Sequence, residues 1–549
     1  MKKMKRIAAI ILALALCFAL AACGSKEETG TTGGGEQPAS TGGGSAPANT
    51  GGGSAPANTG PADSGGPGSD VKIRDVLTMI LEAPIAALDP HNVTSAGNGP
   101  RAIYRCTMDR LIVLTPEGEY IPELATSWHT DDNQTFTFNL RDDVYFHNGQ
   151  KFTAQDVIDT VELSQQAVGS SPYNAFRNVV SITAPDEYSV EMVLSDINVD
   201  FLYSITHPNC CIVNKAAREA DPVSGAWVGT GAYKVTDFSS NNSITLTRNE
   251  DYWGKKGVTE TLRFVYVPET TARLIMLQND EAQVVTGIGA ENLPIVESEP
   301  DKYTIYGVVS DLGFSMVFNT NNRVTGDKNF RAAVTYAISV PDAVAVSAGK
   351  YAKIPVSGSY WGNTTEFLNT DLPVREQDIE LAKQFLAESS YSGEDVEMIS
   401  GTDDSHIYTV LLSEQLRAVG INTSLMVTDV ASLGSIDPQN NTDTQMINSV
   451  APFSRVASGG RSVYYSTGGT NKGHFSIPEI DRIFDVAQTV NDVAEREAMY
   501  KEAQKLFYDE YLAVMFFHRA MTVVAPNFLK GAIIDPEMHH DFRYMYVEE

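Results

Sequence analysis

The chain has 549 residues, and its 69 acidic side chains outnumber 40 basic ones, giving a formal charge of −29. So acidic a chain is poorly suited to nucleic acid or anionic lipid, because the phosphate contacts that dominate such binding need Lys and Arg. The part after residue 70 is long enough for two or three domains with substantial cores.

The first 22 residues have the features of an export signal. Basic residues at 2, 3, 5 and 6 precede an apolar run at 7–22, which is too short for a comfortable transmembrane helix. The run ends in Leu20-Ala21-Ala22-Cys23, which resembles the bacterial lipobox, where the cysteine after the cleavage point receives lipid. We therefore predict a signal peptide at 1–22 and lipid on Cys23. An ordinary signal peptide with a chance cysteine is the alternative.

Residues 23–70 are predicted to be a disordered linker that starts at the lipid anchor. Almost all of 27–70 is Gly, Ser, Thr, Ala, Pro or Asn, and a nine-residue unit at 42–50 is repeated at 51–59. A segment of this composition has nothing to bury. Its root-mean-square span is roughly 35–40 Å, so it can hold a folded domain clear of a membrane.

Short strands and turns are predicted from 71 to 150. Residues Thr135–Leu140 alternate polar and apolar side chains, the period of a half-buried strand, and Asn148-Gly149 is a tight-turn signal. Thr153–Asp156 resembles a capping box, with Asp in place of Glu, ahead of an apolar helical face.

Helices are clearer in the second half. They are predicted at 378–389, at 407–419 before Gly420 and a strand at 421–427, after a cap at Ser476, and at about 494–510. Strands and helices alternate throughout, so the class is α/β or α+β with more than one lobe.

A series of motifs resembles the family 5 solute-binding proteins, the peptide- and nickel-type receptors of ABC importers. Their order and spacing match over about 71–535. The motifs are Leu88-Asp89-Pro90-His91, Met108-Asp109-Arg110-Leu111, Pro122-Glu123-Leu124-Ala125-Thr126-Ser127-Trp128, Phe136–Arg141, Phe146-His147-Asn148-Gly149, Phe152–Val157, Gly229-Thr230-Gly231-Ala232-Tyr233, Asn249–Gly254, Phe318-Asn319 and Phe330–Ile338.

The resemblance implies an α/β, two-lobe periplasmic-binding-protein-like fold. It is the type II, large peptide-receptor form, with an extra subdomain in lobe one and a hinge-closed cleft. Lobe one would hold 71–306 and 514–549, and lobe two would hold 307–513. The chain would cross between the lobes near Tyr306–Val309 and Val514–His518. Most of the motif residues are expected to be scaffold rather than ligand contacts.

The function implied is that of an extracytoplasmic substrate-binding lipoprotein, held at the outer face of the bacterial cytoplasmic membrane. It would capture a peptide or similar small polar solute and deliver it to the permease subunits of an ABC importer. A receptor for a chelated metal such as nickel, or a surface interaction lipoprotein without transport, is the alternative. No cofactor and no nucleic-acid partner are expected.

An enzyme is not expected. The Ser-x-x-Lys pattern at Ser347–Lys350 lacks its companion motifs, and the chain contains neither His-Glu-x-x-His nor a P-loop. No metal site is predicted, because the nine histidines are scattered and only His539-His540, expected at the surface, are adjacent. Cys106, Cys210 and Cys211 are expected as buried free thiols, with one bridge from Cys106 to the pair as the alternative.

The ligand-binding residues are predicted from a difference between this sequence and the peptide receptors of the family. Peptide receptors of the family often carry an acidic residue in lobe two that pairs with the ligand's amino terminus. The corresponding stretch here, Asn448–Arg455, lies in a segment without acids from 445 to 470, and Arg455 and Arg461 occur in it. This favours an anionic ligand, since Arg suits a carboxylate; the alternative is that both are exposed loop residues. The predicted contacts are Asn92, Thr94, Trp361, Asn448, Phe453 and Arg455.

We expect Cys23→Ser to release the protein from membranes, because the lipid attachment point is lost while the folded domain is untouched. Fractionation of cells followed by immunoblotting measures the partition. A Cys17→Ser variant, changed inside the signal peptide, is the control and should stay membrane-bound. Equal membrane partition of Cys23→Ser and the parent would contradict lipid attachment at this residue.

Overall fold

The computed structural model describes residues 72–92, 98–115, 118–289, 291–347, 352–401, 405–428, 432–433, 436, 444–451, 454–532 and 540–548. The predicted signal peptide, Cys23 and the linker therefore lie outside the described residues. Across the described ranges, no helix combines the length and the apolar character needed to span a bilayer.

One large mixed sheet runs through the described part of the chain, in the order β15-β14-β16-β12-β17-β11-β1-β10-β9-β8, with β13 beside β17. Its strands are β1 Val76–Leu81, β8 Tyr233–Ser239, β9 Ser243–Arg248, β10 Thr261–Tyr266, β11 Val284–Thr286, β12 Tyr303–Phe318, β13 Ala352–Lys353, β14 Asp395–Gly401, β15 Asn422–Thr428, β16 Met446–Val450 and β17 Ala513–Pro526.

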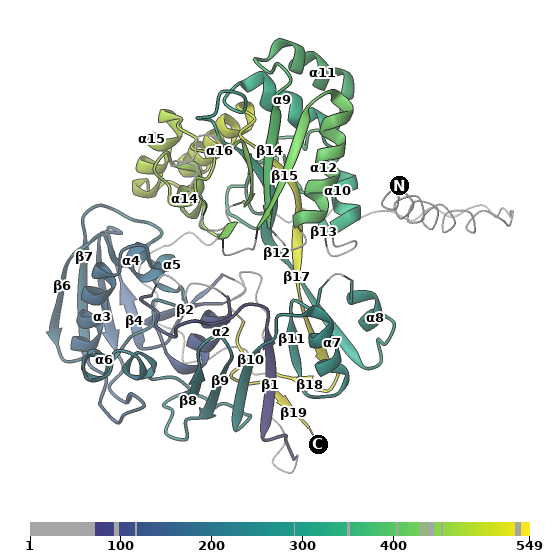
Figure 1. Ribbon diagram of the computed structural model, residues 1–549. Helices are drawn as coiled ribbons and strands as arrows, with labels where there is room; N and C mark the ends of the chain where they lie inside the picture. The colour runs from purple at the N-terminus through teal and green to yellow at the C-terminus, as the bar shows by residue number, and fades with distance from the viewer. Residues whose placement is uncertain are drawn as a thin grey trace, which may run out of the picture. The chain divides into compact units, whose positions relative to one another are not determined.

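Helices lie beside the strands in both halves of the molecule (Figure 1). The first half carries α2 Asn98–Thr107, α3 Ala154–Gln166, α4 Ser171–Phe176, α5 Phe201–Ile205, α6 Lys215–Ala220, α7 Thr270–Gln278 and α8 Leu293–Glu297. The second half carries α9 Lys328–Ala337, α10 Val340–Ser347, α11 Ile379–Glu388, α12 Ser405–Val419, α14 Arg461–Tyr464, α15 Pro478–Val486 and α16 Val493–Asp509.

The two halves are lobes joined by β12 and β17, which pass between them as a long antiparallel pair (Figure 1). The pairing extends from Tyr303 opposite Pro526 to Val317 opposite Ala513, and its register shifts between Val309 and Gly313. The predicted crossings lie on these two strands. The α/β two-lobe fold is thus confirmed, while the residue limits of each lobe and the hinge at this shift stay predictions.

A separate four-stranded sheet, β4-β5-β7-β6, forms the extra subdomain of lobe one. Its strands are β4 Ala125–His129, β5 Thr135–Leu140, β6 Val179–Asp186 and β7 Ser189–Leu194, and β2 Ile112–Leu114 pairs with β3 Tyr120–Pro122 beside it. Phe136 and Phe138 on β5 pack into a buried cluster with Val157 and Val161 of α3. A short pair, β18 Leu529–Lys530 and β19 Tyr546–Val547, completes the lobe.

Several local predictions are confirmed. The strand at Thr135–Leu140 is β5. Gly149 has a positive φ of 86°, as a tight turn requires. Thr153 is the N-cap of α3, and its backbone N–H donates to the Asp156 carboxylate at 2.8 Å. Helix α12 ends before Gly420, whose φ is 99°, so the left-handed residue stops the helix as its position indicated.

Two local predictions are wrong. The N-cap of α15 is Ile477 rather than Ser476, because Pro478 opens the helix and the residue before a proline is held extended. The stretch 71–150 also contains a ten-residue helix, α2, whose first turn includes Gly99 and Pro100. Pro is compatible with the first turn of a helix, so Gly99-Pro100, which also suits a turn, lies here at the start of a helix.

The three described cysteines are buried free thiols in this structure. Burial raises the pKa of Cys106 to about 12, and it raises that of Cys211 to about 12 as well. Their thiols therefore stay protonated and unreactive near neutral pH.

The signature motifs of the sequence meet around one buried carboxylate, Asp109. It accepts hydrogen bonds from the Thr230 hydroxyl at 2.9 Å, the Trp253 indole N–H at 2.9 Å and the Tyr252 hydroxyl at 3.1 Å. Burial, and then the neighbouring Glu123, raise the pKa of Asp109 to about 6. Three motifs that lie far apart in the sequence are thus joined at one acceptor, which confirms that these residues are scaffold.

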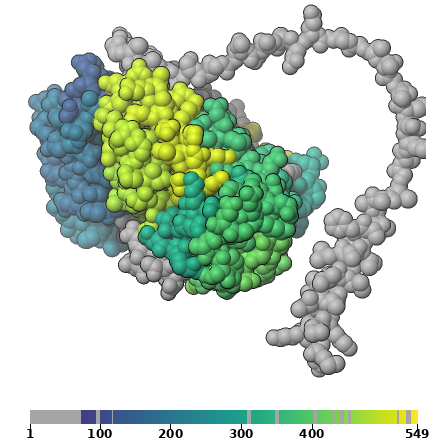
Figure 2. Space-filling view, turned by 90° about the horizontal axis from the view of Figure 1, so that it is seen from above, coloured from purple at the N-terminus to yellow at the C-terminus, as the bar shows by residue number. Residues whose placement is uncertain are grey.

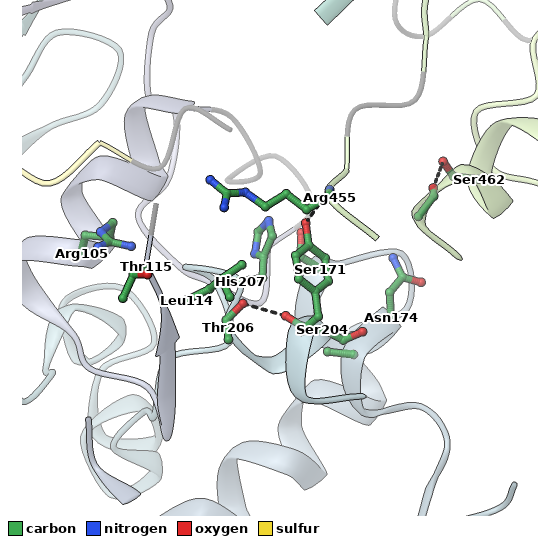
Figure 3. Close-up of a pocket in the computed structure, with 13 residues that line it drawn as sticks. Arg105, Leu114, Thr115, Ser171, Asn174, Ser204, Thr206, His207, Arg455 and Ser462 are labelled. Atoms are coloured by element: carbon green, nitrogen blue, oxygen red, sulfur yellow. Dashed lines mark hydrogen bonds between the residues drawn. The ribbon is translucent and has the colours of Figure 1, made fainter. Parts of the chain in front are cut away.

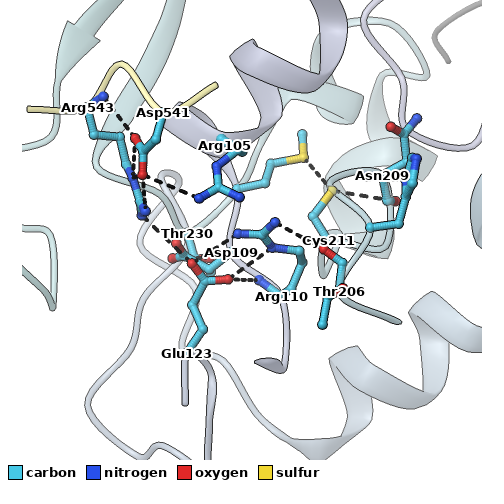
Figure 4. A network of polar contacts seen from close by, with 12 residues as sticks. Arg105, Asp109, Arg110, Glu123, Thr206, Asn209, Cys211, Thr230, Asp541 and Arg543 are labelled. Carbon is cyan, nitrogen blue, oxygen red and sulfur yellow. Dashed lines mark hydrogen bonds and ion pairs between the residues drawn. The ribbon is translucent and has the colours of Figure 1, made fainter. Parts of the chain in front are cut away.

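An ion-pair network surrounds this carboxylate (Figure 4). Glu123 accepts from the backbone N–H of Arg110 at 2.7 Å and from its Nε at 3.1 Å. Arg543, near the end of the chain, pairs with Asp541 at 2.7 Å and approaches Glu123 at 3.7 Å. Arg105 on α2 reaches Asp541 at 3.5 Å. The network ties the C-terminal segment to the core of lobe one and fixes α2.

We expect Glu123→Gln to lower the free energy of unfolding by about 3–5 kcal/mol, because it leaves the buried Arg110 without its charged partner. Chemical denaturation followed by circular dichroism measures the change. Glu479→Gln is the matched control, since the same chemical change there removes an exposed pair with Arg482 and should have little effect. Equal stabilities of the two variants would show that the network does not support the lobe.

Candidate functional site

A pocket of about 380 Å³ lies where residues of the two lobes meet. Its volume falls within the range typical of small-molecule sites. Lobe one contributes side chains from α2, β2, α4 and α5, and lobe two contributes the turn that enters α14 (Figure 3). The lining residues are Arg105, Leu114, Thr115, Ser171, Asn174, Ala175, Tyr203, Ser204, Thr206, His207, Arg455, Gly459 and Ser462.

Local structure holds the lobe-one wall in place. Helix α4 begins at the N-cap Ser170, whose side chain accepts the Tyr173 N–H, and this cap sets Asn174 on the pocket wall. Arg110 of the buried network donates to the Thr206 carbonyl at 3.3 Å. That bond connects the network to the turn that carries Thr206 and His207 into the pocket.

His207 presents a neutral imidazole to the pocket. Burial lowers its pKa well below 6.5, and the nearby guanidinium groups of Arg101 and Arg110 lower it further. Its Nδ1 accepts the Asn209 backbone N–H at 3.1 Å, which leaves the proton of the neutral ring on Nε2. The neutral ring therefore adds no charge to the pocket wall.

Arg455 of lobe two reaches toward lobe one. Its backbone N–H donates to the Tyr203 hydroxyl at 3.3 Å, and the Ser454 hydroxyl lies 3.3 Å from the same atom. Its carbonyl accepts the Glu366 N–H at 2.8 Å. Figure 3 shows the Arg455 side chain alongside His207, with the guanidinium turned toward the side where Arg105 lies. The bonds to Tyr203 and Glu366 anchor the backbone of this arginine.

The described wall of the pocket carries basic side chains. Among the described lining residues, Arg105 and Arg455 are the charged ones, and no Asp or Glu lines the pocket. Burial lowers the pKa of Arg105, and the nearby Arg110 lowers it further. Since the chain as a whole is strongly acidic, a local positive site is needed to hold an anion against the overall field.

Other polar contacts join the lobes beside the pocket. The Asn133 amide donates to Asn491 Oδ1 at 2.9 Å, and the Val199 N–H donates to the Gln488 carbonyl at 3.2 Å. Figure 2 shows the corresponding surfaces, with the yellow-green residues of α14–α16 lying against the blue residues of the extra subdomain. Tyr203, Asn133 and Val199 all belong to lobe one, so hydrogen bonds join the two lobes at each of these residues.

The structure brings one of the six predicted ligand contacts, Arg455, to the pocket wall. Asn92 is exposed and follows the Asp89-Pro90 turn, where its N–H donates to the Asp89 carbonyl. It does not line the pocket. Thr94 and Phe453 lie outside the described residues. Ligand contact by any of these residues stays a prediction.

Two predicted contacts lie in the core of lobe two. Trp361 is 1 % exposed and packs against Tyr464 and Phe484. Asn448 on β16 is 4 % exposed, and its amide donates to the Tyr408 hydroxyl at 3.0 Å. In this structure both support lobe two from inside, because α14 and α15 cover Trp361 and α12 covers Asn448.

Sequence reasoning missed Arg105, Tyr203 and His207. Arg105 stands between the buried residues Tyr104 and Cys106 on α2, and a charged residue inside such a run is a usable signal. Nothing local in the sequence distinguishes Tyr203 or His207, since their place beside Arg455 depends on how the lobes pack.

No cluster of three or more His, Cys, Asp or Glu side chains suited to a metal ion occurs within the described ranges. The expected surface position of His540 is wrong, because its side chain is buried beside Phe542. His539 and most of the Ser347–Lys350 pattern lie outside the described residues.

Comparisons place the chain among known binding proteins. Residues 119–472 match the family model described as bacterial extracellular solute-binding proteins, family 5 Middle. The nickel-binding periplasmic protein of Escherichia coli is 22% identical over 483 residues, covering 82% of this chain and 90% of that protein. The periplasmic oligopeptide-binding protein OppA of Escherichia coli is 23% identical over 481 residues, covering 80% and 87%.

Among solved structures, the ABC transporter substrate-binding protein CtaP from Listeria monocytogenes superposes with a TM-score of 0.77. The two chains are 21% identical, and the match covers 87% of this chain and all of the other. At this identity the likeness concerns the fold, and it agrees with the two-lobe architecture described above.

Proposed function

The chain belongs to the family 5 bacterial extracellular solute-binding proteins, and from this membership we propose that it is the lipid-anchored receptor of an ABC importer. It captures a small polar solute, a peptide or a related compound, and presents it to the permease subunits. The lipid is carried by Cys23, and the linker at 23–70 lets the folded part stand away from the membrane. The receptor itself carries out no chemistry on the solute.

The observation that carries this proposal is the pocket lined by both lobes. A solute that contacts both walls favours the closed arrangement over the open one by the difference in its affinity for the two. Closure of this kind is a hinge motion, and the register shift on β12 between Val309 and Gly313 is a suitable place for it. An importer that recognises the closed form would then distinguish loaded from empty receptors.

The charge of the pocket favours a solute with an acidic group. The relatives named above bind nickel or oligopeptides, so membership alone leaves the ligand class open. Here Arg455 replaces the acid expected in a receptor for a free peptide amino terminus, and the described wall has no carboxylate to pair with an ammonium group. We therefore favour an anionic solute held at Arg455 over a simple cationic or zwitterionic peptide.

A melting experiment tests the function. The purified protein is unfolded, freed of small molecules, refolded and mixed with the low-molecular-mass fraction of a complex growth medium. We expect this fraction to raise the melting temperature, because a solute that binds only the folded state stabilises it by mass action. No change with any fraction would contradict a receptor function and favour a surface interaction lipoprotein.

The same assay locates the site. With the purified solute, Arg455→Ala should bind more weakly by about 2–5 kcal/mol in titration calorimetry, because one partner of an enclosed charge pair is lost. Arg461→Ala is the matched control, since Arg461 pairs with Asp485 at 2.7 Å and stacks on Tyr465, and it should bind normally. Unchanged affinity in Arg455→Ala, or a cationic solute, would overturn the assignment.

A further inference from the structure

Two carboxylates from different lobes meet at one turn of the chain, the short helix η4 Ala457–Gly460 of lobe two. Glu366 of lobe two accepts the Ala457 backbone N–H at 3.1 Å. Asp200, the N-cap of α5 in lobe one, is hydrogen-bonded to the side chain of Ser458, the next residue of η4. The two acids therefore bind neighbouring residues of the same turn, one from each lobe.

The contact made by Asp200 depends on the closed arrangement of the lobes. Its side chain makes no capping bond to α5, although it occupies the N-cap position, and the residue is 8 % exposed. The backbone N–H of the preceding residue, Val199, donates to the Gln488 carbonyl of lobe two at 3.2 Å. Opening of the lobes would break both contacts and return the Asp200 carboxylate to water.

The charged and titratable groups around the two acids do not balance their charges. Arg496 of α16 attracts both carboxylates. Tyr500 of the same helix also faces them, and burial raises its pKa, so its hydroxyl stays neutral. Arg461 faces Tyr500, and Arg455 bonds Glu366 through its backbone carbonyl. Among the described residues, Arg496 is thus the cation that acts on both acids.

In the closed arrangement the two acids cannot both ionise without cost. Burial raises the pKa of Asp200, although the bond from Ser458 and the charge of Arg496 oppose this effect. Burial, and then the charge of Asp200, raise the pKa of Glu366 from its usual 4.5 to about 7. Asp200 therefore ionises first, and Glu366 holds a proton in mildly acidic surroundings.

The sign of the pH effect follows from this difference. Separation of the lobes removes the charge of Asp200 from Glu366 and exposes the turn to water, which lowers the pKa of Glu366. The closed form then binds a proton that the open form has released. Between these two pKa values the closed form is favoured by low pH, and this advantage is lost as the pH rises through about 7.

We propose that Asp200 of lobe one and Glu366 of lobe two form a pH-sensitive contact between the lobes, which favours closure in mildly acidic surroundings and opening in alkaline ones. This inference rests on the proposed receptor function, since it concerns the regulation of the closure that retains the solute. The receptor would hold its solute more firmly at acidic pH and release it more readily at alkaline pH.

The test measures lobe opening without any solute. The purified full-length protein is freed of small molecules, and hydrogen exchange of peptides that contain Val199 is followed by mass spectrometry at pH 5.5 and 8. The rates are corrected for the intrinsic dependence of exchange on pH. The Val199 amide bonds the opposite lobe, so its protection reports the fraction of closed protein. Peptides from β5, inside lobe one, report whether that lobe itself loosens.

We expect the parent to protect the Val199 amide about tenfold more at pH 5.5 than at pH 8, because a proton is taken up on closure. Glu366→Gln keeps an acceptor for the Ala457 N–H but cannot ionise, so its protection should be high and equal at both pH values. Glu479→Gln is the matched control, since Glu479 forms an exposed pair with Arg482, and it should behave as the parent does.

A second variant keeps the test decisive if Glu366→Gln folds poorly. Asp200→Asn removes the charge that acts on Glu366, so it should raise protection at pH 8 and weaken the pH dependence. Protection that does not change with pH in the parent, or that changes equally in Glu366→Gln or in β5, would overturn the inference. The receptor function would still stand, because its own test is the rise in melting temperature with solute.

Discussion

The buried ion-pair network of lobe one is the interaction on which the rest of the structure depends. Charges are costly to bury unless they are paired and hydrogen-bonded, and here Asp109, Glu123 and Asp541 are surrounded by arginines and neutral donors. Glu123 comes from an early segment, and Asp541 comes from the end of the chain. The network therefore holds the early and late segments of lobe one together without a contribution from a ligand.

The same network prepares the binding pocket. One of its arginines, Arg105, extends from Asp541 to the pocket wall, and another, Arg110, fixes the turn that carries His207. One of the basic side chains on the pocket wall is thus held in place by the buried network of lobe one. Arg455 lies on the other lobe, so its distance from Arg105 changes when the lobes open. When a site is divided between two lobes in this way, the ligand makes all of its contacts only in the closed form, and its binding therefore favours closure.

The local elements were largely predictable because their signals are local. Alternation identified β5, the Thr153 and Asp156 pair identified the start of α3, and Gly420 identified the end of α12. The ordered motifs predicted the two-lobe fold, which the family match and the structural likeness confirm. The helix α2 was missed because Gly and Pro in its first turn also favour a turn.

The sequence predicted a residue of the pocket wall only at the position where it differs from the peptide receptors of the family. Arg455 was identified because it replaces an expected acidic residue, and this replacement can be seen in the sequence without a structure. Arg105 and His207 could not be joined to it, since their approach depends on the packing of α2 and α5 against the opposite lobe. Trp361 was placed at the site because nothing local shows that Tyr464 and Phe484 cover it.

The most direct measurement is a crystal structure of the protein with the solute it retains from growth medium. We predict that the solute lies in the pocket between α2, α5 and the segment that carries Arg455, with an acidic group within hydrogen-bonding distance of the Arg455 guanidinium. A solute bound elsewhere, or one that does not contact Arg455, would contradict a receptor that holds an anionic solute at this residue.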